Sequence, residues 1–217
     1  MELHTPILIL ISVLLTILSF YVLLRNPKNP ICISFFVMTF GAIVWVLSNS
    51  TNTGLWGDIF MKLMYVGALI LLTGFTYFSF YFPYKITNIS FPKHLIVITP
   101  CLIMILILYT TNLFIIDYDE NGKVLTGFVY NIFAVYFLTF WFWGSYNLVK
   151  KYKNAYGIHR WQLKNIFLAL ILPFIAGVTT NLLLPWLFNI WHLVWVGPMF
   201  SIIFFGFASY IIFKKKI

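Results

Sequence analysis

The residues that could bind a ligand are a few polar and aromatic side chains near the ends of long apolar segments. Hydroxyl, amide, ammonium and carboxylate groups can hold a small or amphiphilic molecule by hydrogen bonds and charge, and indole rings can stack on it. We therefore expect a ligand-binding group made of Trp45, Asn49, Asp58, Lys62, Tyr65, Thr180, Asn181, His192 and Trp195.

The same positions also have a purely structural interpretation, and the sequence alone leaves both open. Trp, Tyr and His gather at membrane surfaces as an aromatic belt, and Asn and Thr side chains hold neighbouring helices together. By helical rise, all of these residues lie within about 15 Å of one membrane surface. A ligand pocket there would occupy the outer third of a bundle.

No pattern of catalytic residues is present. The four histidines have neither HxxxH nor HExxH spacing, and the two cysteines, Cys32 and Cys101, lie in separate apolar segments. The sequence has no Gly-rich phosphate loop and no GxSxG motif. A microbial rhodopsin is also excluded, because residues 190–213 contain no lysine that could carry retinal. We expect no catalytic residue, no metal site and no cofactor.

The composition is that of a membrane protein. Of 217 residues, 62% are hydrophobic and only 9% are charged, whereas about a quarter of a soluble domain is charged. The net charge of +9 comes from short basic runs between apolar segments, which is typical of loops facing anionic lipid. We expect membrane lipid as a partner and no nucleic acid.

Seven apolar segments predict an all-α, seven-helix membrane bundle that uses residues 1–217 as a single domain. The third segment is expected to be central, because its small residues Gly67, Ala68 and Gly74 would let neighbouring helices approach closely. The segments are residues 6–24, 31–48, 56–83, 95–115, 130–149, 163–184 and 190–213.

The basic residues predict the orientation of the bundle. Twelve of the fourteen basic residues fall on one side of the predicted bundle. All five acids, at positions 2, 58, 117, 119 and 120, fall on the other side together with Lys62 and Lys123. Because basic loops stay in the cytoplasm, we expect the amino end outside and the carboxyl end inside. The other twelve basic residues fall on the inner side: Arg25, Lys28, Lys85, Lys93, Lys150, Lys151, Lys153, Arg160, Lys164, Lys214, Lys215 and Lys216.

The outer loop between the fourth and fifth segments predicts a short β-hairpin. Asn121-Gly122 favours a two-residue turn, which would place Tyr118 opposite Leu125 and Glu120 opposite Lys123. This hairpin is either a plain connection or a lid over an outer pocket.

The seventh segment carries the residues expected to transmit a signal. Gly197 and Ser201 have a spacing that permits close helix packing, and Pro198 either marks a bend or helps to start the helix.

Several short motifs, in their order along the chain, resemble the seven-helix sensor region at the amino terminus of prokaryotic histidine kinases. The resemblance covers essentially the whole chain. Besides the outer hairpin, the motifs are Asn29-Pro30, Trp45, Phe80-Tyr81-Phe82-Pro83, Arg160-Trp161-Gln162, Asn181 with Pro185, and Gly197-Pro198.

The resemblance implies a non-enzymatic, multi-pass module of the cell membrane that receives a signal and passes it through the seventh span. It implies a cytoplasmic output domain or kinase partner, and a homodimer. We expect no output domain within residues 1–217, which are then either the sensor part of a longer chain or a stand-alone relative that signals through a partner. An unknown small or amphiphilic ligand would be the signal. The alternative is a small transporter or lipid-handling protein, which would need a continuous polar path.

Overall fold

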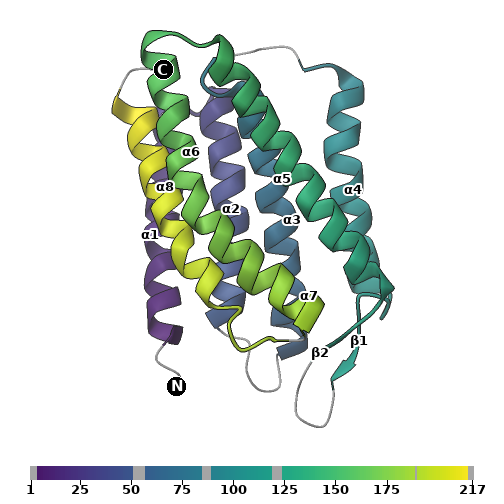
Figure 1. Ribbon diagram of the computed structural model, residues 1–217. Coiled ribbons are helices and arrows are strands. Elements are labelled where there is room, and N and C mark those ends of the chain that lie inside the picture. Colours follow the sequence, from purple (N-terminus) through teal and green to yellow (C-terminus); the bar gives the residue numbers. More distant parts are fainter. Residues whose placement is uncertain (1–3, 51–56, 85–88, 119–123, 189, 215–217) are drawn as a thin grey trace.

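The computed structural model describes residues 4–50, 57–84, 89–118, 124–188 and 190–214. These residues form a bundle of long helices with a small two-stranded sheet at one end (Figure 1). The elements are α1 (His4–Arg25), α2 (Pro30–Ser50), α3 (Gly57–Tyr81), α4 (Phe91–Thr110), β1 (Ile115–Tyr118), β2 (Val124–Thr126), α5 (Phe128–Asn154), α6 (Gly157–Val178), the π-helical turn η2 (Thr179–Leu183), α7 (Leu184–Phe188) and α8 (Val196–Lys214).

Within the described ranges, six helices are long and apolar enough to cross a membrane, and α8 contains a shorter apolar helix. One of the six is the continuous rod formed by α6, η2 and α7 (Gly157–Phe188). The last helix begins at Val196 and not at residue 190, so that boundary of the prediction was wrong. Pro198 is the third residue of α8, where a missing N–H costs nothing. Its position in the first turn favours the prediction that it helps to start the helix.

Local chemistry accounts for several helix ends. The Asn29 Oδ1 atom accepts a hydrogen bond from the Ile31 N–H (3.0 Å), which caps α2, while Pro30 occupies its first position. As expected, α3 stops at the Phe82-Pro83 motif, whose peptide bond is cis. The tight connection from α5 to α6 uses Gly157 at φ +56°, a conformation that favours glycine.

The helices α2 and α3 form the most extensive contact in the bundle, and glycines make it possible. A Cβ atom on Gly67 would lie 2.5 Å from the backbone nitrogen of Trp45, and one on Gly41 would lie 2.7 Å from the carbonyl oxygen of Gly67. A Cβ on Gly74 would meet the backbone of Met38. The predicted close approach at Gly67 and Gly74 is confirmed, and Ala68 is buried beside them.

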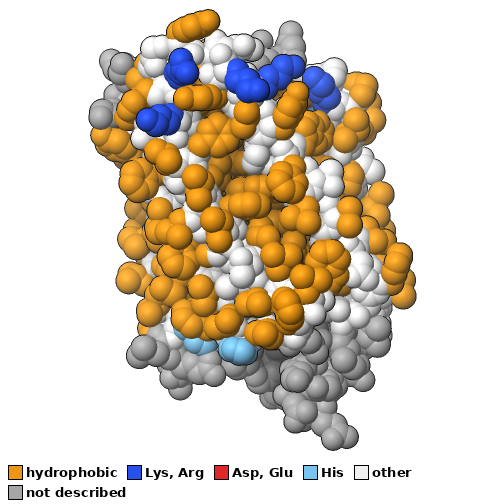
Figure 2. All heavy atoms as spheres, viewed as in Figure 1, with side chains coloured by type: hydrophobic (Ala, Val, Ile, Leu, Met, Phe, Trp, Pro, Cys, Tyr) orange, Lys and Arg blue, Asp and Glu red, His pale blue; other side chains and the backbone are white. Residues whose placement is uncertain are grey.

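The surface has the distribution expected of a membrane bundle. Large apolar side chains cover its sides, and Lys and Arg side chains gather at one end (Figure 2), the end at which α5 joins α6 in Figure 1. The first turn of α1 and the last turn of α8 lie at opposite ends of the bundle.

The strands β1 and β2 pair antiparallel between α4 and α5, but the predicted register was wrong. Tyr118 pairs with Val124, and Asp117 pairs with Leu125, one residue out of phase with a two-residue turn at 121–122. An irregularity between Ile115 and Asp117 accompanies this register. The Asn121-Gly122 turn and the expected Glu120–Lys123 pair lie outside the described residues.

Candidate functional site

A hydrogen-bonded group joins the first turn of α8 to the π-helical turn η2. The Thr180 hydroxyl donates to the Ala176 carbonyl oxygen (2.8 Å). The Thr180 Oγ1 atom also accepts from the Gly197 backbone N–H (3.1 Å) and from the Asn181 Nδ2 atom (2.9 Å). The π-helical turn therefore supplies the polar atoms that hold α8 against α6. Such turns are frequent at functional sites.

Gly197 allows this contact because it has no side chain. A Cβ atom there would lie 2.9 Å from the Gly177 Cα atom and 3.0 Å from Thr180 Oγ1, and it would also meet Asn181 Nδ2. Ser201, one turn further along α8, is 4% exposed, and its hydroxyl donates to the Pro198 carbonyl oxygen (2.6 Å). Both residues thus lie against other helices and not against lipid.

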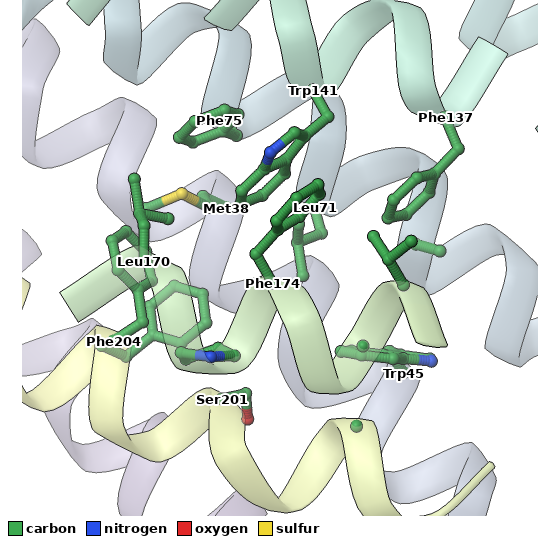
Figure 3. Close-up of a pocket in the computed structure, with 16 residues that line it drawn as sticks. Met38, Trp45, Leu71, Phe75, Phe137, Trp141, Leu170, Phe174, Ser201 and Phe204 are labelled. Atoms are coloured by element: carbon green, nitrogen blue, oxygen red, sulfur yellow. The ribbon is translucent and has the colours of Figure 1, made fainter. Parts of the chain in front are cut away.

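An apolar cavity of about 70 Å³ lies inside the bundle beside this contact (Figure 3). Five helices line it. Among the described lining residues, only Ser201 carries a hydroxyl group. The lining residues are Met38 and Trp45 of α2; Ala68, Leu71 and Phe75 of α3; Phe137 and Trp141 of α5; Leu170, Pro173, Phe174, Gly177 and Val178 of α6; and Gly197, Ser201, Phe204 and Phe205 of α8.

Three stacked rings form one wall of the cavity. Trp141 of α5 lies between Phe75 of α3 and Phe174 of α6, with ring centroids 4.7 Å and 4.4 Å apart and interplanar angles of 15° and 5°. Gly144 makes room for Phe75, because a Cβ atom there would lie 2.6 Å from the Phe75 ring. The stack connects three helices through flat, polarisable surfaces that suit an apolar or aromatic occupant.

A smaller cavity of about 30 Å³ brings together three of the predicted ligand-binding residues. Trp45, Tyr65 and Asn181 all line it. It shares four lining residues with the larger cavity: Trp45, Ala68, Phe137 and Gly177. The Asn181 Oδ1 atom is buried and has no hydrogen-bond partner within the described part of the chain. A buried acceptor in that state costs about 1–3 kcal/mol and would gain from a donor carried by an occupant.

The family of the chain follows from a match over almost its whole length. A family model described as the N-terminal 7TM region of histidine kinase matches residues 7–214. The chain belongs to this family. No curated protein and no solved structure matches it significantly.

As an N-terminal 7TM region of a histidine kinase, the protein is a multi-pass protein of the plasma membrane. It is the input region of such a kinase and not the catalytic part. Among the described residues, no group of three or more His, Cys, Asp or Glu could hold a metal ion.

The other predicted ligand-binding residues of this 7TM region lie away from the two cavities. Asn49 is buried one turn beyond Trp45 and donates to the Trp45 carbonyl oxygen (2.8 Å). Lys62 is half-buried on α3, and His192 is exposed. Trp195 stacks on the His4 ring of α1, with centroids 5.1 Å apart. The side chain of Asp58 lies outside the described residues.

The sequence analysis did not predict the three stacked rings that form one wall of the larger apolar cavity. Phe75, Trp141 and Phe174 lie inside apolar segments and carry no mark that separates them from rings facing lipid. Small residues within the apolar segments were one usable signal, because Gly144, Gly177 and Gly197, on three different helices, each border this region.

Proposed function

We propose that this 7TM region receives a signal by binding a small apolar or amphiphilic molecule in the cavity between α2, α3, α5, α6 and α8. The observation that carries the proposal is the share of the cavity wall that α8 supplies. Gly197, Ser201, Phe204 and Phe205 all belong to that helix, which is the seventh span. In a histidine kinase, the seventh span leads toward the output domain.

The size of the cavity supports a coupling between binding and helix position. Its volume of about 70 Å³ suits a small apolar group, since an engineered cavity of about 150 Å³ binds benzene. A larger molecule, or the chain of an amphiphile, would need a wall to move. Such a ligand favours the arrangement with the wider cavity, and its effect is limited by its difference in affinity for the two arrangements.

The polar end of such a ligand would lie toward Trp45, Tyr65 and Asn181. We place this end of the bundle outside and the basic end inside, as the charge distribution favours. The unpartnered Asn181 Oδ1 atom offers an acceptor for a hydroxyl or amide group. In this proposal, Gly197, Pro198 and Ser201 form the part of α8 that transmits the signal.

Substitutions on α8 test the proposal in this region joined to a histidine-kinase output domain. Ser201→Leu fills the cavity and should change kinase output and weaken its response to signal. Ile203→Leu is the control, because Ile203 is half-buried on the same helix and does not line the cavity. Output is compared at matched membrane abundance. Equal output and equal response from both variants would remove the cavity from the mechanism.

A further inference from the structure

A third cavity, of about 470 Å³, lies at the basic end of the bundle. It is formed where α3 ends, α4 begins and the last turns of α5 pass between them. The backbones of α4 and α5 hardly approach each other, so the space between them is not closed by helix packing. The cavity shares no lining residue with the two cavities described above.

Among the described residues that line this cavity, three are lysines and none carries a carboxylate. Lys93 comes from the first turn of α4, and Lys150 and Lys151 come from α5. The acids whose backbone is described, Asp58 and Asp117, belong to the first turn of α3 and to β1, which follows α4. Each is thus separated from the cavity by most of a helix. The positive charge is therefore not balanced by a nearby side chain of the described part.

The three lysines have different roles. The Lys151 ammonium donates to the carbonyl oxygens of Ser79 (2.9 Å), Phe80 (2.6 Å) and Phe82 (2.8 Å), so it is held by the end of α3. Lys93 and Lys150 are exposed and have no hydrogen-bond or ion-pair partner among the residues that the structure describes. Two ammonium groups, one from α4 and one from α5, are thus available to an anion in the cavity.

Other groups in the cavity also favour an anion. The first turn of α4 presents the positive end of a 20-residue helix, and its capping residue Ser90 makes no side-chain cap hydrogen bond. Asn147 on the α5 wall carries an amide donor, used here toward Ser79 Oγ at 3.2 Å. The backbone N–H groups of Lys93 and His94 already donate to the Ser90 carbonyl oxygen, so α4 contributes its positive end and not free N–H groups. The Asn147 amide is a donor suited to an anionic oxygen.

We propose that this cavity binds the phosphate group of an anionic phospholipid from the surrounding membrane. Phe80, Ile89 and Trp143 give the cavity an apolar part that a bare phosphate would not use. The outward faces of the flanking helices are apolar, with Ile96 and Phe142 more than half exposed, so acyl chains can lie against them. Basic pockets between membrane helices are known sites for anionic headgroups. The bound phosphate would join α4 to α5 through Lys93 and Lys150.

The test compares two double variants of equal charge in nanodiscs of phosphatidylcholine with a minor fraction of phosphatidylglycerol. Lys93→Gln with Lys150→Gln removes the two available ammonium groups and leaves Lys151 in place. Lys153→Gln with Lys164→Gln is the control, because both lysines are exposed and neither lines the cavity. Native mass spectrometry measures the phosphatidylglycerol that stays bound when each protein is released from the nanodisc.

We expect the wild type to retain phosphatidylglycerol over phosphatidylcholine, and the first double variant to lose this preference by about tenfold. The control pair should stay within about twofold of the wild type. Equal losses in both pairs would overturn the site in favour of general surface charge. The lipid assignment would be overturned if lipid-free protein bound inorganic phosphate as tightly as it binds the lipid, and if the same two lysine substitutions abolished that binding.

Discussion

At the scale of single residues, Gly197 has a role that no other residue type could fill without moving a helix. Its backbone N–H donates to Thr180 Oγ1, and its Cα hydrogens face the backbone of Gly177. The neighbouring atoms belong to the backbone and to short side chains, which cannot swing aside. A methyl group at this position would therefore weaken the contact between α6 and α8.

Gly197→Ala should lower the free energy of unfolding by about 1–3 kcal/mol, as expected when a packed core is overfilled. Gly206→Ala is the matched control on the same helix, because a Cβ atom there would meet nothing within 4 Å. Unfolding of the purified variants in mixed micelles with increasing denaturing detergent measures the difference. Equal stability of the two variants would contradict the close contact.

Lys151 of α5 donates to three backbone carbonyl oxygens at the end of α3 and just beyond it. Lys151→Met should destabilise the protein by about 1–3 kcal/mol, because it removes a charged donor from three carbonyl groups to which water has only partial access. Lys153→Met removes an exposed charge and should change stability by less than about 0.5 kcal/mol. Thermal unfolding followed by circular dichroism compares them, and a smaller loss for Lys151→Met than for Lys153→Met would contradict the capping role.

At the scale of elements, α2 and α3 behave as one packed pair. Gly41 and Gly67 face each other across this contact, since a Cβ atom on either would lie within 2.8 Å of the other's carbonyl oxygen. Trp45 follows Gly41 by one turn, and its ring reaches Gly177 of α6. The α2–α3 contact thus fixes the position from which Trp45 extends toward the cavities.

Because the two glycines meet at one place, their substitutions should not be additive. Gly41→Ala and Gly67→Ala should each destabilise the protein by about 1–3 kcal/mol. The double variant should cost less than the sum, because the first Cβ atom already separates the helices. A double-mutant cycle measured by detergent unfolding gives the coupling energy. Strict additivity would show that the two positions are independent.

Hydropathy predicts the helices well and the irregular elements poorly. The end of α3 and the glycine contacts follow from residues visible in the sequence. The π-helical turn does not, because the extra residue in Thr179–Leu183 leaves no mark in composition. The late start of α8 was missed because residues 190–195 are mostly apolar and carry no formal charge, so they read as part of the same segment. The hairpin register was missed because Asn121-Gly122 suggested the commonest turn.

At the scale of the whole molecule, most of the positive residues lie apart from the two apolar cavities that Trp45 lines. The basic side chains gather at one end (Figure 2), whereas Trp45, Tyr65 and Asn181 lie toward the other. The cavities themselves could not be predicted, because lining and lipid-facing rings are of the same type. Phe204 is 5% exposed and lines a cavity, whereas Phe207, three residues later, is 55% exposed.

The proposed orientation predicts the accessibility of single cysteines introduced after Cys32 and Cys101 are replaced by Ala. In intact cells, a membrane-impermeant maleimide should label His192→Cys and should label Lys153→Cys only after permeabilisation. Both positions are exposed at opposite ends of the bundle, so burial does not hide either one. Labelling of Lys153→Cys from outside intact cells would reverse the topology.

The attachment of Lys151 to the end of α3 also has a consequence for biogenesis. The ammonium group and the carbonyls that it contacts are separated by 69 to 72 residues of chain. During synthesis, α3 therefore enters the membrane before its cap has been translated. Water and lipid headgroups must serve these carbonyls until α5 emerges from the ribosome and inserts. The hydrogen bonds from Lys151 to the end of α3 can form only at that stage, so the contact between α3 and α5 is completed late in the assembly of the bundle.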